Sequence, residues 1–562
     1  MKRHCFWILL LVGWALAVPA AAAESEEEGK MIFRAMEEEM ARSLKELKID
    51  TFGPPYFINY QVRHHDRAEV VATFGALLSS DIKQKQTLFV DVKVGKPEFD
   101  SSHPQSHKYV TESLIPLDNQ PDALKRALWY ETDLRYKQAI VNFLKKKGRF
   151  ISGVESHDLA DFSVGKTPQV RFGEIPRWAP RMQDWEGLAK TVSARFQHAP
   201  DIEKSKVQIY ANRTLRYYYD SEGNKIREGK LYYGVAIEGW VRSPEGDRLH
   251  DEESIYLHEG DAFPTEQELL ERTDRLIASL QKLKQAPRMD PYIGPAIFSP
   301  DATAVLFHEA IGHRLEGDRL REDGDGKTFL KKIGRPILPE FLTVTDNPEL
   351  NRFEGTPLLG HYRFDDEGQE SEEVVLVEDG TLQNFLLTRM PVLGFSRTNG
   401  HARGDGIHSP MSRMSNFIIT SKSQVDAATL KRKLIEEVVR QGKPYGLFVK
   451  KIIGGETQTE QGRFQVFKGE PLYLYKVFPD GREEMVRGVD FVGTPLSMIG
   501  KVMVTGENRE VINGFCHAES GSIPVTSIAP SVLLSEVELQ SAKKMRVRPP
   551  ILTPPAVTPV AH

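Results

Sequence analysis

The chain has 562 residues and a nearly balanced charge, with 74 Lys and Arg against 79 Asp and Glu and a formal net charge of -5. A composition of 40% hydrophobic and 27% charged residues is typical of soluble globular proteins, and this length predicts roughly two to four domains. Both figures exclude a small protein built on disulfides. Nucleic-acid binding needs clustered Lys and Arg, so a sequence pI of about 6.4 without a long basic block predicts no nucleic-acid partner.

The first 23 residues have the three parts of a secretory signal peptide. Lys2 and Arg3 form a positive start, residues 5–18 are almost wholly apolar, and the alanines at 20–23 offer a cleavage site. The alternative is a retained anchor, but the apolar run is shorter than the ~20 residues that a membrane-spanning helix needs. We expect a signal peptide at 1–23, an exported chain that is periplasmic or secreted, and no integral membrane segment in the mature chain.

Removal of the signal peptide leaves one cysteine. Cys5 lies in the predicted leader, so Cys516 is the single thiol of the mature chain and an intramolecular disulfide is impossible. An unpaired thiol in an exported protein indicates metal ligation, nucleophilic chemistry or an intermolecular bridge. The remaining alternative is an inert core cysteine that packs as a small hydrophobe.

The first part of the mature chain mixes helix and strand patterns. An amphipathic segment at 31–47 predicts a helix, and alternating runs at 56–62 and 88–94 predict strands. A longer helix is expected over residues 124–147. We therefore expect an N-terminal α/β domain over residues 24–150.

Residues 151–290 predict antiparallel β-hairpins followed by a closing helix. Apolar and polar residues alternate over 206–257, with turn signals between the runs. Thr265 and Glu268 have the spacing of a capping box, in which each side chain accepts a hydrogen bond from the backbone of the other residue. A helix should begin there and close this middle domain.

Residues 291–540 predict mostly strands and one prominent helix. Ser299 is a favoured N-cap and Pro300 a favoured first helical residue, so a helix should begin here. Downstream, the pattern predicts two strands, a polar loop and a second helix, at residues 373–378, 382–387, 399–409 and 426–440.

The last 22 residues, 541–562, are rich in proline and predict an extended tail. The expected fold class is α+β. It comprises an N-terminal α/β domain, an antiparallel β-hairpin middle region and a β-rich C-terminal domain that carries the prominent helix.

That helix ends in the sequence His-Glu-Ala-Ile-Gly-His. In zinc peptidases, a His-Glu-x-x-His spacing puts two imidazoles one turn apart, with the Glu facing the metal-bound water. Here the spacing is one residue longer, so His308 and His313 would lie ~140° apart on an ideal helix. Both reach one ion only if the helix bulges or ends before His313, and Gly312 permits that distortion at least cost. We predict a metal-binding helix with two histidine ligands and Glu309 as the catalytic base.

A catalytic zinc takes three protein ligands and keeps a fourth position for water, so two histidines leave one ligand missing. Cys516 can supply it, because a thiolate is a strong zinc ligand and metal binding would protect the sulfur from oxidation. Glu316 and Asp318 are rival carboxylate ligands, or helix-end charges that pair with nearby arginines. A donor set of two His and one Cys favours one zinc ion per chain over hard cations such as Mg²⁺.

Further segments accompany the His-Glu motif in order along residues 295–540. With the motif's own segment at 308–318, the set comprises residues 308–318, 365–368, 377–380, 399–400, 410–416 and 514–516. As a set, the sequence resembles the TldD/PmbA metallopeptidase family, on the TldD-like, metal-bearing side. The resemblance implies a zinc-dependent endopeptidase acting on unstructured peptides, with His308, His313 and Cys516 as ligands and Glu309 as base. It also implies a homodimer, or a heterodimer with a related subunit.

The implied chemistry is metal-assisted hydrolysis of an amide bond. Zinc would lower the pKa of its water toward ~7 and polarise the scissile carbonyl, while Glu309 takes the proton and passes it to the leaving amine. We expect an unfolded or extended peptide to add as a strand to a sheet edge. The oxyanion needs a further donor, for which the candidates are His401, Arg403, His408 and His517. Each candidate also has a simple surface or loop-packing interpretation.

Three other functions stay open from the sequence. The His-Glu-x-x-Gly-His spacing is shared with dipeptidyl-peptidase III enzymes, exopeptidases in which a separate Glu supplies the third ligand. A non-catalytic partner subunit would hold structural zinc in a closed four-ligand site, for example with Glu316 added. A metal-free cysteine hydrolase would use Cys516 as nucleophile and the adjacent, poorly placed His517 as base.

Overall fold

The structure is a computed structural model, and it describes residues 20–49, 51–102, 112–152, 159–321, 325–457, 467–492 and 495–542 together with residues 550, 552 and 555. The predicted signal peptide lies outside the described residues as far as residue 19. The predicted tail lies outside them apart from residues 541, 542, 550, 552 and 555. Among the described helices, none is both long and apolar enough to cross a membrane.

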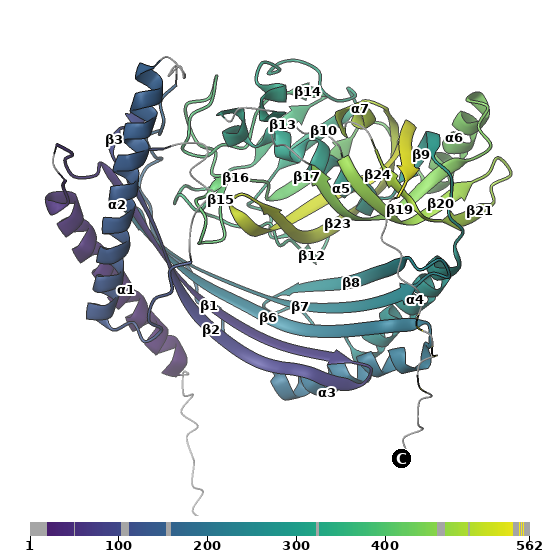
Figure 1. Cartoon of the computed structure of the whole chain (residues 1–562), viewed down its shortest axis with the longest axis horizontal. Coiled ribbons are helices and arrows are strands. Elements are labelled where there is room, and N and C mark those ends of the chain that lie inside the picture. The colour runs from purple at the N-terminus through teal and green to yellow at the C-terminus, as the bar shows by residue number, and fades with distance from the viewer. Residues whose placement is uncertain are drawn as a thin grey trace, which may run out of the picture.

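A curved sheet of six strands forms the lower half of the view in Figure 1, as far as the chain is described. Strands β2, β1, β6, β7 and β8 pair antiparallel in that order, and β5 joins β7 in parallel. Because β1 pairs with β6, residues 24–150 and 151–290 contribute to one sheet. The strands are β1 (Phe57–Thr73), β2 (Ala76–Lys93), β5 (Val170–Phe172), β6 (Ile202–Asp220), β7 (Lys225–Arg242) and β8 (Arg248–His258).

Four helices cover one face of this sheet within the described residues. Along β1, Val62 packs with α1 and α2, whereas Ala68 and Val70 pack with α3 and α4. Gln61 and Arg63, which alternate with these residues, lie on the opposite face. One face is therefore apolar and the other polar. The helices are α1 (Ala20–Glu46), α2 (Pro121–Ile151), α3 (Met182–Ala194) and α4 (Glu266–Gln285).

Two helices begin at the caps predicted from the sequence. Thr265 Oγ1 accepts the backbone N–H of Glu268 at 3.2 Å, and Glu268 Oε2 accepts the backbone N–H of Thr265 at 2.8 Å, which completes the capping box of α4. Ser299 Oγ accepts the N–H of Ala302 at 3.2 Å at the start of α5 (Pro300–Ala310). In contrast, α2 continues past its predicted end at residue 147, with Gly148 inside the helix.

A second, mixed sheet occupies the C-terminal half, with twelve strands among the described residues. Its main path runs β14, β13, β10, β17, β24, β9, β19, β20 and β21, while β22 and β23 pair with β24 and β18 pairs with β23. These strands are β9 (Tyr292–Phe298), β10 (Leu342–Asp346), β13 (Val374–Glu378), β14 (Thr381–Leu382), β17 (Asn416–Ser421), β18 (Gln424–Val425), β19 (Gly446–Thr457), β20 (Phe467–Val477), β21 (Glu483–Val486), β22 (Val489–Phe491), β23 (Val502–Ala518) and β24 (Gly521–Ser541).

Short elements complete this half. Helices α6 (Ala427–Arg440) and α7 (Pro495–Ile499) pack on the second sheet, and Asp426, the first residue of the predicted helix, is the N-cap of α6. Two-stranded ladders join β3 (Gly95–Lys96) to β4 (Phe99–Asp100), β11 (Arg352–Phe353) to β12 (Thr356–Pro357), and β15 (Ala402–Arg403) to β16 (Met411–Ser412).

The C-terminal half lies over the polar face of the six-stranded sheet, while α3 and α4 lie on the opposite side (Figure 1). The largest apolar cluster is inside the C-terminal half, around Phe298, Phe307 and Phe417. Helix α5 is buried in that cluster and is therefore held on several sides. The predicted α+β fold class is confirmed.

Candidate metal centre

Helix α5 ends before the second histidine of the motif. It stops at Ala310, and a 3₁₀ turn, η3 (Gly312–Leu315), carries His313. Arg314 Nη1 donates to the carbonyls of Glu309 and Ala310 at 3.1 and 2.8 Å, which satisfies two of the backbone acceptors left at the helix end. The change from α-helix to 3₁₀ turn is the distortion that the longer spacing demanded.

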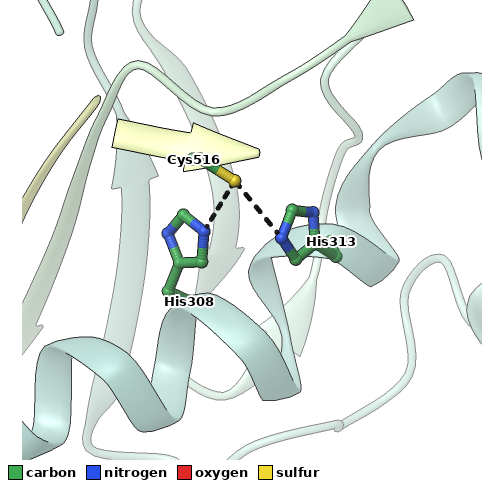
Figure 2. A group of neighbouring side chains, drawn as sticks. All are labelled: His308, His313 and Cys516. Atoms are coloured by element: carbon green, nitrogen blue, oxygen red, sulfur yellow. Dashed lines mark hydrogen bonds between the residues drawn. The ribbon is translucent and has the colours of Figure 1, made fainter. Parts of the chain in front are cut away.

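This turn brings three donor side chains together, as Figure 2 shows. Cys516 Sγ lies 3.1 Å from His308 Nε2 and 3.5 Å from His313 Nε2. The two imidazole rings are nearly perpendicular, with centroids 4.9 Å apart. All three donor atoms lie within 4.8 Å of one another. Ligand atoms of a tetrahedral zinc are ~3.6 Å apart when they lie at their usual distances from the ion, so this donor set fits zinc in both chemistry and spacing.

The position of the sulfur is set by β23. Cys516 lies opposite Ile523 in the β23–β24 pair, and side-chain alternation buries Cys516 while Phe515 and His517 are exposed. The guanidinium of Arg413, which is fully buried, donates from Nη2 to the Cys516 carbonyl at 2.9 Å. Strand and arginine together hold the thiol toward the two histidines.

Glu316 lies behind His313 and outside the donor cluster. Its Oε1 is 3.0 Å from His313 Nδ1, the nitrogen that faces away from the sulfur. Its Oε2 accepts from Arg319 Nε at 2.6 Å, and Arg319 forms a bidentate pair with Glu519 at 2.9 Å for both contacts. The side chain of Glu316 is completely buried. It therefore orients His313, as carboxylates do behind metal-bound histidines.

Asp318, the other carboxylate considered as a ligand, also lies outside the cluster. Its Oδ1 accepts from Thr388 Oγ1 at 2.7 Å and its Oδ2 accepts from the Ser412 backbone N–H at 2.9 Å. These bonds join the chain after the motif to β16. Asp318 is a structural link at this position.

Charges in the cluster favour the metal-binding form of the cysteine. Burial alone would raise the pKa of Cys516, but His308 and His313 lower it well below its usual value. Burial would lower the pKa of His313, yet Glu316 and Cys516 raise it to about 10. Burial opposes the charge of Glu316 as well, and His313 and Arg319 lower its pKa to about 2. The two histidines thus favour the thiolate of Cys516, which is the form that ligates metals.

The four candidates for an oxyanion donor lie in different settings. His401 is fully buried between Asn399 and Asp346, with Nε2 3.2 Å from Asp346 Oδ1. His408 Nδ1 is 2.9 Å from Asp405 Oδ2. These two histidines hold loops together. Arg403 uses Nη1 on the carbonyl of Met414 and Nη2 on that of Pro524, and His517 is exposed on the face of β23 opposite Cys516.

The supporting residues were not assigned a role from the sequence. Arg413 belongs to a family-like segment at 410–416, but the sequence does not show that it reaches Cys516 across 103 residues. Glu519 reaches Arg319 across 200 residues. The one signal in the sequence that could have pointed to Glu519 is its position, three residues after the predicted ligand Cys516.

Comparison with known proteins places this centre in a family. Residues 292–541 match the model of the PmbA/TldA metallopeptidase C-terminal domain. A metalloprotease of Archaeoglobus fulgidus is 30% identical over 354 residues, which are 61% of this chain and 76% of the relative. A zinc metalloprotease TldD homolog of Saccharolobus solfataricus is 27% identical over 347 residues, 60% of this chain and 72% of the relative. Two further relatives are matched over 47% of their length.

The whole fold also has a counterpart among solved structures. TldE from Thermococcus kodakarensis superimposes with a TM-score of 0.59 at 14% identity, covering 90% of this chain and 100% of that one. At this identity the likeness concerns the fold alone. The sequence relatives and the family model, which covers α5 and β23, carry the assignment: the chain belongs to the TldD/PmbA metallopeptidase family.

Proposed function

We propose that this chain is a zinc-dependent peptidase in which His308, His313 and Cys516 hold one zinc ion and Glu309 is the general base. The observation that carries the proposal is the convergence of three donor atoms within 4.8 Å. Glu309 follows His308 directly on the same helix and is 9% exposed. The name of the Saccharolobus relative supports zinc as the metal.

The residues of this chain divide the work of amide hydrolysis. Zinc in this site would acidify a water and polarise the scissile carbonyl. The Glu309 carboxylate accepts the proton of the attacking water and delivers it to the nitrogen of the leaving amine. Glu316 keeps His313 in one orientation, and Arg413 keeps Cys516 in place.

The substrate and setting belong to the same proposal. An unfolded or extended peptide fits the β-rich half, in which β21 ends the main strand path and offers backbone groups for an added strand. Relatives with TldD and TldE in their names support a homodimer or a heterodimer with a related subunit. The leader at residues 1–23 supports export to the periplasm or the medium.

The test compares the purified mature chain with Glu309→Gln and Cys516→Ala. We expect the wild type to contain about one zinc per chain and to hydrolyse a pool of unfolded peptides. Glu309→Gln should keep the metal and lose hydrolysis, because it removes the base and leaves the ligands. Cys516→Ala should lose the metal, measured by elemental analysis.

If the purified wild type contains zinc but hydrolyses no peptide, the assay is repeated with a related subunit added. If the wild type contains zinc but hydrolyses no peptide, either alone or with the related subunit, the chain is a subunit that holds structural zinc and the peptidase proposal is refuted. Absence of metal from protein purified without chelators would refute the metal site itself.

A further inference from the structure

A cavity lined by several charged side chains lies between the two sheets beside the strand that carries Cys516. It has a volume of about 240 Å³. The polar face of the first sheet forms one wall through β1, β6 and β7, and the C-terminal half forms the other. Phe515, Ile523 and Pro524 of the β23–β24 pair line it. Ile523 is the cross-strand partner of Cys516 and packs against it, so one lining residue of the cavity contacts the cysteine, whereas the Phe515 side chain lies on the other face of β23.

Two arginines in this cavity already have carboxylate partners. Arg63 and Arg216 lie directly opposite each other on β1 and β6, and both donate to Asp366 Oδ1, at 2.6 and 2.7 Å. Arg216 is also paired with Glu228, its neighbour on β7, at 2.5 Å. These charges balance and join the two halves of the molecule.

Two further cations in the same cavity lack such a partner. Among the ion pairs of the described residues, none includes Lys230 or Arg403. Lys230 Nζ donates to the His361 carbonyl at 3.1 Å, and Arg403 Nη2 donates to the Pro524 carbonyl at 2.8 Å. Both cations lie over the ring of Tyr362, at 5.5 and 4.8 Å from its centroid.

Two more carboxylates line the cavity, Asp365 and Asp405, but neither forms an ion pair with these cations: Asp365 accepts from the backbone N–H groups of Glu367 and Gln369, and Asp405 lies against His408. Lys230 is exposed to the open space of the cavity, while Arg403 is buried at 4% exposure. Surrounding protein atoms and the charge of Arg403 lower the pKa of Lys230 to about 8, which shows how poorly its charge is compensated. An anion that enters the cavity would find two cations that no carboxylate of the described residues pairs with.

We propose that Lys230 and Arg403 form a subsite for a carboxylate of the peptide substrate. The subsite rests on the proposed peptidase function and specifies which peptides are preferred. The size of the cavity suits one side chain or one chain end. A carboxylate is the anion that a peptide carries, either on Asp and Glu side chains or at its C-terminus, and lysine and arginine bind it by charge-assisted hydrogen bonds.

The first arm of the test compares peptides that differ in one carboxylate. One pair differs by Glu against Gln at successive positions, and the other by a free C-terminal acid against an amide. We expect roughly tenfold higher kcat/KM for one acidic form, expressed in KM with kcat within about twofold. A preference within the Glu and Gln pair would show that the subsite binds a side-chain carboxylate, and a preference within the acid and amide pair would show that it binds the C-terminal carboxylate.

The second arm replaces Lys230, because replacing Arg403 would also free two backbone carbonyls. Lys230→Gln should abolish the preference by raising KM for the acidic peptide alone, and Lys230→Arg should restore it. Lys225→Gln, on the same strand and outside the cavity, should keep it. Equal kinetics for acidic and neutral peptides in the wild type, or a preference that survives Lys230→Gln, would overturn the subsite.

Peptide binding to zinc-loaded Glu309→Gln, measured by calorimetry, separates this proposal from the peptidase itself. A carboxylate preference in binding that disappears with Lys230→Gln would support the subsite even if the wild type hydrolyses nothing. Hydrolysis without any carboxylate preference would support the peptidase and refute the subsite. Failure of the acidic peptides to bind better than the neutral ones would also refute it.

Discussion

Glu316 shows how a residue outside the donor set would influence the metal that we propose. It is buried between His313 on one oxygen and Arg319 on the other. When a metal replaces the proton on Nε2, a carboxylate at 3.0 Å would keep the remaining proton of His313 on Nδ1 and leave Nε2 to ligate on the side of Cys516. The carboxylate also adds negative charge behind the ligand, which strengthens its bond to a cation.

Glu316→Gln should therefore weaken zinc binding by about 10- to 100-fold without removing a ligand. The measurement is competition for zinc against a chelator of known affinity. Glu519→Gln is the matched control, because it removes the outer partner of Arg319 and leaves the contact between Glu316 and His313 intact. Equal zinc affinity in Glu316→Gln and wild type would show that the carboxylate does not orient the ligand.

The donor residues could be predicted from the sequence, and their support could not. His308 and His313 share a local spacing, and Cys516 is the single thiol of the predicted mature chain. The contact of Arg413 with the Cys516 carbonyl depends on the pairing of distant strands. An arginine is common in any sequence, so it carries no comparable local signal.

At the scale of elements, the end of α5 depends on Gly312. A Cβ at this position would lie 2.1 Å from Met414 Sδ, and the glycine does not have a left-handed backbone. The sequence suggested glycine for backbone freedom, whereas the structure shows that it makes room for a neighbouring side chain. The turn that carries His313 can pack against Met414 only without a side chain here.

Gly312→Ala should lower the free energy of unfolding by about 1–3 kcal/mol and reduce zinc content, because the 3₁₀ turn must move away from Met414. Urea unfolding of the metal-free protein and elemental analysis measure the two effects. Gly514→Ala is the control, since it lies on the strand of Cys516 with nothing within 4 Å of the added Cβ. Unfolding within about 0.5 kcal/mol of the wild type would contradict the steric reason.

Strand length was harder to predict than helix starts. The alternation predicts a strand over 56–62, but β1 runs to Thr73. After Val62, the next residues on the helix-covered face are His64 and Asp66, which interrupt the apolar pattern. Asp66 is buried and accepts from Arg213 Nε at 2.7 Å, a partner 147 residues away. The alternation of apolar and polar residues along one strand cannot show that a buried carboxylate is paired with an arginine of another strand.

At the scale of the whole molecule, Asp366 joins the two sheets. It lies in the C-terminal half and receives hydrogen bonds from Arg63 and Arg216 of the first sheet. Gln61 Nε2 also donates to its carbonyl, at 2.5 Å. The polar face of the first sheet is therefore an internal surface, which explains why its alternating pattern looked like that of a sheet facing water.

Asp366→Asn should lower the free energy of unfolding at pH 7 by about 3 kcal/mol, because two buried guanidinium groups lose their shared anion. Burial opposes the charge of Asp366, but Arg63 and Arg216 lower its pKa below 3.8. The stabilisation is therefore complete above that value and is lost as the pH falls through the lower folded-state pKa. The difference between wild type and variant should narrow below about pH 3.8 in urea unfolding.

Glu372→Gln is the control for this experiment, because Glu372 pairs with Lys166 at the surface. An exposed pair contributes little, so this change should stay within about 1 kcal/mol of the wild type. A loss in Asp366→Asn no larger than in Glu372→Gln would show that the two halves are held together by other contacts.

The order of the donors along the chain has a consequence for when the metal arrives. His313 and Cys516 are 203 residues apart, and a ribosome makes the histidines long before the cysteine. Until β23 pairs with β24, an ion would meet two nitrogen ligands and bind weakly. The zinc ion that we propose would thus be the last component to join a finished chain. For a chain exported as we propose, it would come from the destination compartment and not from the site of synthesis.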